Sequence, residues 1–195
     1  MSVLEKDRTE TPFTTRDNML EIWNRMTELS FRGFGLKKRK PPKTPGNFDT
    51  WSEKSRQSYL VKMEDKRKQQ EQWDLMFIQN ESRIVDDLCR QIVYLIDASN
   101  TISPQYLCEC DDQRLKQDEA IGLCNNLKRE LNHIAETIPC NKNFLAKITE
   151  DIAHEIELLK GWRKSCNAKR KSVIEKEISM RTTVAEKMGF IINGS

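Results

Sequence analysis

Aromatic side chains are scarce in this sequence: they make up 7% of the 195 residues, and all hydrophobic residues together make up only 37%. This is little apolar material for a compact core of that length, but it is enough for the narrow apolar stripes along packed helices. Charged residues make up 32%. The composition therefore favours an elongated helical protein over a globular one.

Long hydrophobic runs are missing as well. No apolar segment approaches the roughly 18 to 20 residues that span a bilayer, and the first ten residues lack the layout of a secretory signal. We therefore expect an intracellular protein. The cysteines are scattered through helical patterns, which favours free thiols over a disulfide framework. They are Cys89, Cys108, Cys110, Cys124, Cys140 and Cys166.

The motifs of common active sites are also absent. There is no phosphate-binding glycine loop, serine nucleophile elbow or zinc-protease helix motif. His133 and His154 fall on different helices at levels about 9 Å apart, so they cannot share a metal ion. Cys108 and Cys110 have no second ligand pair at the spacing of a zinc site. We expect a protein that is not an enzyme and has no metal, cofactor or small-molecule substrate.

Proline and glycine occur at few places, and they divide the chain. We expect a flexible tail over residues 1–14 and a short amphipathic helix over residues 15–32, where apolar residues recur every three or four positions. Gly33 ends this helix, and a basic linker with prolines and glycines covers residues 33–50. A helix this short must dock on a partner or, as we favour, on the rest of this chain.

Three long helices are predicted after the linker, over residues 51–99, about 112–138 and 143–188. The first has no proline or glycine, is about 70 Å long, and follows a capping box of Thr50 and Glu53. The connections between the helices are short, so neighbouring helices run antiparallel. We predict an all-α fold: an elongated antiparallel three-helix bundle or coiled coil over residues 51–190, with a tail at 191–195.

The last helix has a strict seven-residue apolar repeat from Leu145 to Met180. Among the companion positions of the repeat, Arg163, Arg170 and Glu177 are charged, and a buried unpaired charge there would be costly. We therefore expect this side to be open to water or matched by opposite charges of another chain. Residues 51–72 and 171–188 should project as polar arms. The predicted partner-binding seam is Arg163, Arg170, Val173, Glu177, Met180 and Val184.

The linker holds five basic residues between positions 37 and 43, and Asp49 is its first acidic residue. Three interpretations stay open: a nuclear-import signal, an extended contact with an acidic surface, and a plain solubilising linker. The flanking aromatic residues favour the contact, because they can anchor an extended segment in a partner's groove. Thr44 before Pro45 is a candidate phosphorylation site. The predicted contact residues are Phe34, Lys37, Lys38, Arg39, Lys40, Lys43, Phe48 and Trp51.

Together these patterns predict a non-enzymatic structural subunit of a larger intracellular assembly. A cytoskeletal setting is favoured, meaning a microtubule, ciliary, centrosomal or kinetochore complex. The alternative is a nuclear adaptor in a DNA- or RNA-associated complex that uses the basic linker as an import signal or phosphate contact. We expect other coiled-coil proteins as partners, in a hetero-oligomer more than a homo-oligomer. A membrane-surface module is disfavoured, because no broad apolar face is ringed by lysines.

Overall fold

The computed structural model describes residues 12–40 and 43–188, together with the side chains of residues 14–40 and 43–188. These residues form helices and no strand, which confirms the predicted all-α fold. The tail predicted at 191–195 lies outside the described residues. The elements are α1 (Pro12–Phe31), the short 3-10 turns η2 (Gly33–Gly35) and η3 (Phe48–Thr50), α2 (Glu53–Thr101), α3 (Leu107–Thr137) and α4 (Lys142–Lys187).

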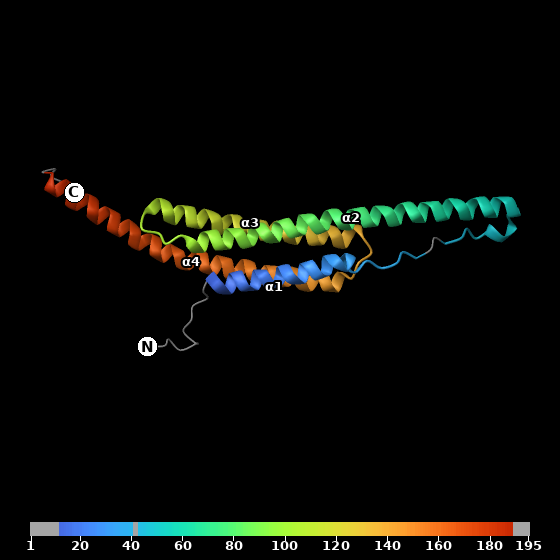
Figure 1. Ribbon diagram of the computed structural model, residues 1–195, viewed down its shortest axis with the longest axis horizontal. Helices are drawn as coiled ribbons and strands as arrows, with labels where there is room; N and C mark the ends of the chain where they lie inside the picture. The colour runs from blue at the N-terminus through green and yellow to red at the C-terminus, as the bar shows by residue number, and fades with distance from the viewer. Residues whose placement is uncertain (1–11, 41–42, 189–195) are drawn as a thin grey trace, which may run out of the picture.

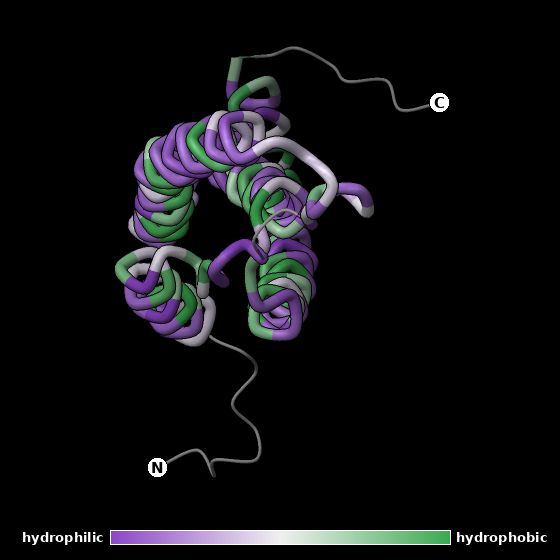
Figure 2. The backbone as a smooth tube through the Cα atoms, turned by 90° about the vertical axis from the view of Figure 1, so that its right-hand side faces the viewer, coloured by the Kyte–Doolittle hydropathy of each residue, from purple (hydrophilic) through white to green (hydrophobic). Residues whose placement is uncertain are grey.

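Four helices pack against one another, because the short helix predicted at residues 15–32 joins the three long ones; the detail of a three-helix bundle or coiled coil is not confirmed. α1 packs against α2 and α4, and α3 packs against the same two helices from the opposite side. Figure 2 shows this ring of helices along its length. Each helix runs antiparallel to both of its neighbours (Figure 1). The short connections from α2 to α3 and from α3 to α4 favour this arrangement.

The apolar stripe of α1 explains why the fourth helix joins the bundle. Four of its side chains are buried in the common core, at Met19, Ile22, Met26 and Leu29. Two ion pairs fix the helix at its edges: Arg16 bonds Asp97 of α2 at 2.8 Å, and Arg25 bonds Asp151 of α4 at 2.6 Å. Docking within the chain, which the sequence favoured, therefore removes this stripe from any role in partner binding.

Two helix starts differ from the prediction because another residue satisfies the first backbone amides. α2 begins at Glu53, and its cap is the Ser52 hydroxyl, which accepts from the amide of Ser55. The predicted cap, Thr50, instead donates its hydroxyl to the Asn47 carbonyl. α3 begins at Leu107, several residues before the predicted start near 111–112, because the Glu109 carboxylate accepts from the amide of Tyr106.

Two helices extend beyond the ring as arms (Figure 1). The α2 arm, residues 53–73, projects from one end of the bundle, and the linker runs beside it to its tip. The α4 arm, residues 178–187, projects from the other end. None of the helices within the described residues is both long enough and apolar enough to span a membrane.

Candidate functional sites

The start of the linker is anchored to the bundle. Gly33, Phe34 and Gly35 all have positive φ, and Phe34, at 53°, is the only residue other than glycine to do so in the described backbone. A bulky residue rarely adopts this conformation, so burial of the ring must offset its strain. Phe34 is fully buried in the core. It is therefore a structural residue, which corrects its predicted role as a partner anchor.

Arg39 is also used within the chain. Its guanidinium bonds both carboxylate oxygens of Asp74 on α2, at 2.9 and 2.7 Å. This hydrogen bonding lowers the pKa of Asp74 and raises that of Arg39. The Asp74 side chain is only 3% exposed, so its charge needs this partner. Arg39 thus fixes the linker to the base of the α2 arm and is not a free contact residue.

The remaining basic side chains of the linker are exposed, as is the candidate phosphosite Thr44. They are Lys37, Lys38, Lys40 and Lys43. Charge also gathers along the neighbouring arm: residues 37–72 contain eleven Lys and Arg but five Asp and Glu, whereas the whole chain has a net charge of +3. The linker and the α2 arm therefore form one basic unit on a molecule that is otherwise slightly acidic.

The aromatic residues at the far end of the linker pack on one another. Phe48 and Trp51 each lie within 5.7 Å of the Tyr59 ring, measured between ring centroids, and 5.7 Å from each other. Such a cluster stabilises the tip, since aromatic pairs at this separation attract beyond their burial. Phe48 and Trp51 are half-buried as a result, and they attach the end of the linker to the first turns of α2.

The predicted seam on α4 divides into a covered part and an uncovered part. Arg163 bonds Asp118, and Arg170 bonds Asp111 at 3.0 Å, both on α3 of the same chain. Glu177 accepts from the amide of Leu107 at the start of α3. We predicted that carboxylates of another chain would pair with Arg163 and Arg170. Both carboxylates come from α3 of the same chain, so these two arginines give no reason to expect a partner.

Beyond Glu177 the α4 seam has no covering helix (Figure 1), yet it stays apolar. Val173 is buried, whereas Met180 is 54% exposed and Val184 is 51% exposed. Met188 continues the same stripe at the end of the described chain and is also exposed. We call Met180, Val184 and Met188 the α4 stripe. Met180 and Val184 belong to the predicted seam and remain available to a partner, whereas Met188 was not predicted.

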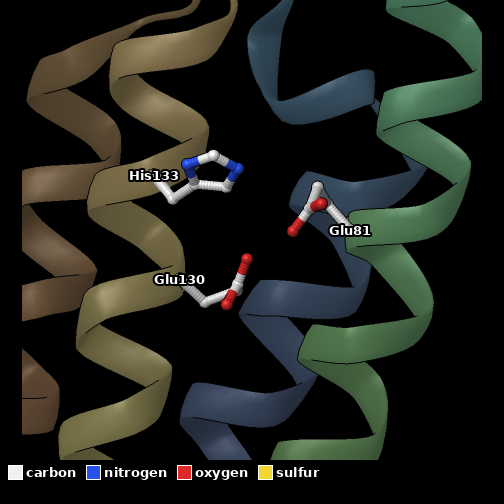
Figure 3. A group of neighbouring side chains, drawn as sticks. All are labelled: Glu81, Glu130 and His133. Atoms are coloured by element: carbon white, nitrogen blue, oxygen red, sulfur yellow. The ribbon is translucent and has the colours of Figure 1, made fainter.

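A cluster of possible metal ligands lies between α2 and α3, near the base of the α2 arm (Figure 3). Glu81 comes from α2, and Glu130 and His133 come from α3; one ligand atom of each lies within 4.8 Å of the others. Burial and the nearby Glu130 carboxylate raise the pKa of Glu81 to about 7, although the Asn80 amide and His133 oppose the shift.

A second buried carboxylate, Glu155 of α4, lies deep in the bundle. Neither of its oxygens has a hydrogen-bond partner within the described residues, although the nearby Asn18 side chain acts to lower its pKa. Desolvation dominates and raises the pKa of Glu155 to about 8. Glu155 also raises the pKa of the neighbouring Cys124 thiol, which burial has already raised.

The buried cysteines have raised pKa values. Burial raises the pKa of Cys89 to about 12 and also raises the pKa values of Cys110 and Cys140. A nucleophilic cysteine needs a lowered pKa, because the thiolate is the reactive form. All six thiols are free. The buried ones are therefore small apolar residues of the core.

The ligand cluster and Glu155 were missed by reasoning from the sequence. The two histidines lie too far apart to share a metal ion, and the cluster becomes visible only when His133 is combined with carboxylates. The spacing of Glu130 and His133, three residues apart on a predicted helix, was the available signal.

Comparisons with protein families, with curated proteins and with solved structures found no match to this chain.

Proposed function

We propose that this chain is a non-enzymatic scaffold subunit of a larger intracellular assembly, and that its two arms bind different partners. The observation that carries the proposal is the α4 stripe. An isolated helix as short as the α4 arm is only marginally stable in water. Its half of an apolar seam adds no stability while it has nothing to pack against. A second helix laid along Met180, Val184 and Met188 would complete the seam as a coiled coil.

The partner of the α4 arm is proposed to be another helical protein. The stripe advances by four residues at each step and is narrow, which suits one helix and not a broad apolar surface. Arg181 and Lys187 beside it favour a partner helix that carries acidic residues at its flanking positions. We therefore favour a hetero-oligomer over a homo-oligomer.

The α2 arm is proposed to contact an acidic surface. Four exposed lysines of the linker lie beside a helix that is itself rich in basic residues, so positive charge is displayed along the length of this arm. A microtubule or another cytoskeletal polymer is the favoured surface. The same exposed lysines support a second candidate, a nuclear adaptor that contacts nucleic-acid phosphates or is imported through this segment. Phosphorylation of Thr44 would weaken either contact.

The α4 stripe can be tested with paired charge substitutions. Met180→Asp with Val184→Asp introduces two charges into the stripe, whereas Ser179→Asp with Thr183→Asp introduces the same charges one residue earlier on exposed positions. We expect the first pair to abolish recovery of partners in affinity purification with mass spectrometry, and the second to leave it intact. Equal recovery with both variants would contradict the role of the stripe, and light scattering would report self-association.

The basic arm needs a separate experiment. Replacing Lys37, Lys38, Lys40 and Lys43 with Gln removes four charges but leaves the Arg39 anchor in place. We expect this variant to lose salt-dependent cosedimentation with microtubules, or binding to duplex DNA if the nuclear candidate holds. The matched control neutralises four exposed lysines of α4, namely Lys142, Lys147, Lys164 and Lys169. Unchanged binding by the linker variant would remove both candidates for this arm.

A further inference from the structure

The ligand cluster of Glu81, Glu130 and His133 has the layout of a metal site (Figure 3). Positions three residues apart lie on one face of a helix, so Glu130 and His133 point together toward α2. Glu81 faces them from that helix. A Glu and a His at this spacing, opposite a Glu of a facing helix, is a donor set with which helix bundles bind metal ions.

The burial of Glu81 and the lack of a hydrogen-bond partner for one of its oxygens provide an independent reason to expect a cation. This residue is only 4% exposed, and its carboxylate points into the cluster. Oε1 accepts from the Asn80 amide at 3.3 Å, whereas Oε2 has no hydrogen-bond partner among the residues described. A buried carboxylate oxygen without a donor is unfavourable. A carboxylate oxygen of Glu130 lies within 4.8 Å of the ligand atom of Glu81, so a positive ion between the two carboxylates would interact favourably with both.

We propose that Glu81, Glu130 and His133 form a binding site for a divalent transition-metal ion, with Zn²⁺ as the first ion to test. One imidazole nitrogen and two carboxylates suit Zn²⁺ or its first-row neighbours, whereas Ca²⁺ and Mg²⁺ prefer ligand sets made of oxygen alone. Bonds of about 2.0–2.2 Å place tetrahedral ligands about 3.4 Å apart. The three ligand atoms lie within 4.8 Å of one another, so the side chains must move by about an ångström.

The surroundings of His133 fit this role. The ring of Phe77 packs against the imidazole with centroids 5.5 Å apart, and the Thr137 hydroxyl lies 3.5 Å from Nδ1. With Nδ1 directed to Thr137, Nε2 is the nitrogen available to the ion, as is usual when a second group orients a ligating histidine. His133 is exposed, so an ion can enter from solvent, and water can complete the coordination.

The proposed ion would join α2 to α3 close to the point where α2 leaves the bundle. Asp74, which holds the linker through Arg39, lies two turns before Glu81 on the same helix. Binding would therefore stiffen the base of the α2 arm. This property is separate from partner binding by either arm, and it can be tested on the isolated chain.

The test uses the full chain, purified with a chelator and then titrated with Zn²⁺. We expect one ion per chain by isothermal titration calorimetry. At a free Zn²⁺ concentration about 100 times the dissociation constant, the melting temperature should rise by about 5 to 10 °C. Ca²⁺ and Mg²⁺ should give no rise at the same concentration. Co²⁺ should give visible absorption bands without a thiolate charge-transfer band, since no sulfur ligand is proposed.

Matched variants separate this site from adventitious binding. Glu81→Gln keeps the side-chain shape and should stay folded, as helical circular dichroism will show, but should lose the Zn²⁺-dependent rise. His133→Ala should lose it too, whereas His154→Ala and Cys108→Ser should retain it, because both of those residues are exposed elsewhere. The proposal is overturned if Glu81→Gln binds Zn²⁺ as tightly as the unchanged chain, if Cys108→Ser abolishes binding, or if Ca²⁺ stabilises equally.

Discussion

Replacing the buried Glu155 with Gln should stabilise the protein at neutral pH. The folded chain raises the pKa of this carboxyl from 4.5 to about 8, mainly through desolvation. Between these two values the folded state holds a proton that the unfolded state has lost. Stability therefore falls as the pH rises from about 4.5 to about 8, because the unfolded state binds fewer protons. Gln has nearly the same shape and cannot ionise.

The magnitude follows from the distance between the working pH and the unfolded pKa. At pH 7 that distance is about 2.5 pH units, and at about 1.36 kcal/mol per unit the carboxyl destabilises the fold by about 3 kcal/mol. The Gln amide is itself buried with few partners, which reduces the expected gain to about 2 kcal/mol. A gain of this size corresponds to a rise of about 4 to 8 °C in the melting temperature.

The measurement is urea unfolding of both chains, followed by far-ultraviolet circular dichroism at several pH values. The gap in unfolding free energy should be near zero at about pH 4.5 and should widen as the pH rises to about 8. Glu150→Gln, an exposed change on the same helix, should show no such widening. A gap that is absent at pH 7, or independent of pH, would refute the assignment of Glu155 as a desolvated carboxyl.

Two further changes test how the linker is held. Phe34→Ala should destabilise the fold by about 3 to 5 kcal/mol, because it empties a core position, whereas Phe31→Ala, on an exposed ring, should have almost no effect in the same urea assay. Arg39→Ala should lower the unfolding free energy by about 1 to 2 kcal/mol and speed amide exchange near Asp74, because that buried carboxylate loses its main partner. The control Lys38→Ala, on an exposed side chain, should change neither quantity.

The sequence predicted the long helices well because their signals are local and repeated. Heptad spacing on α4 and the absence of Pro and Gly in α2 both depend on residues within one helix. The number of packed helices was harder to predict. The stripe of α1 has the same appearance in the sequence whether it docks within the chain or on a partner. Its burial in the common core and its ion pairs with Asp97 and Asp151 become visible only in the structure.

The candidate sites were predictable only in part, for a related reason. The sequence places Phe34 and Arg39 in a basic linker, where an aromatic ring and a guanidinium are typical partner contacts. Their burial and pairing depend on Asp74 and on the core, which lie far along the chain. Likewise, Glu81 is separated from Glu130 by 49 positions, so their proximity follows from the register of two helices and not from any motif.

A single helix, α2, runs without interruption from the tip of its arm through the bundle, and its 49 residues correspond to about 70 Å. Because no hinge divides α2, a force applied at the tip of the arm would move the arm and the bundle together as one rigid body. The opposite end of the molecule is likewise one continuous rod. If the two arms bind partners as proposed, the lengths of α2 and α4 set the distance between those partners.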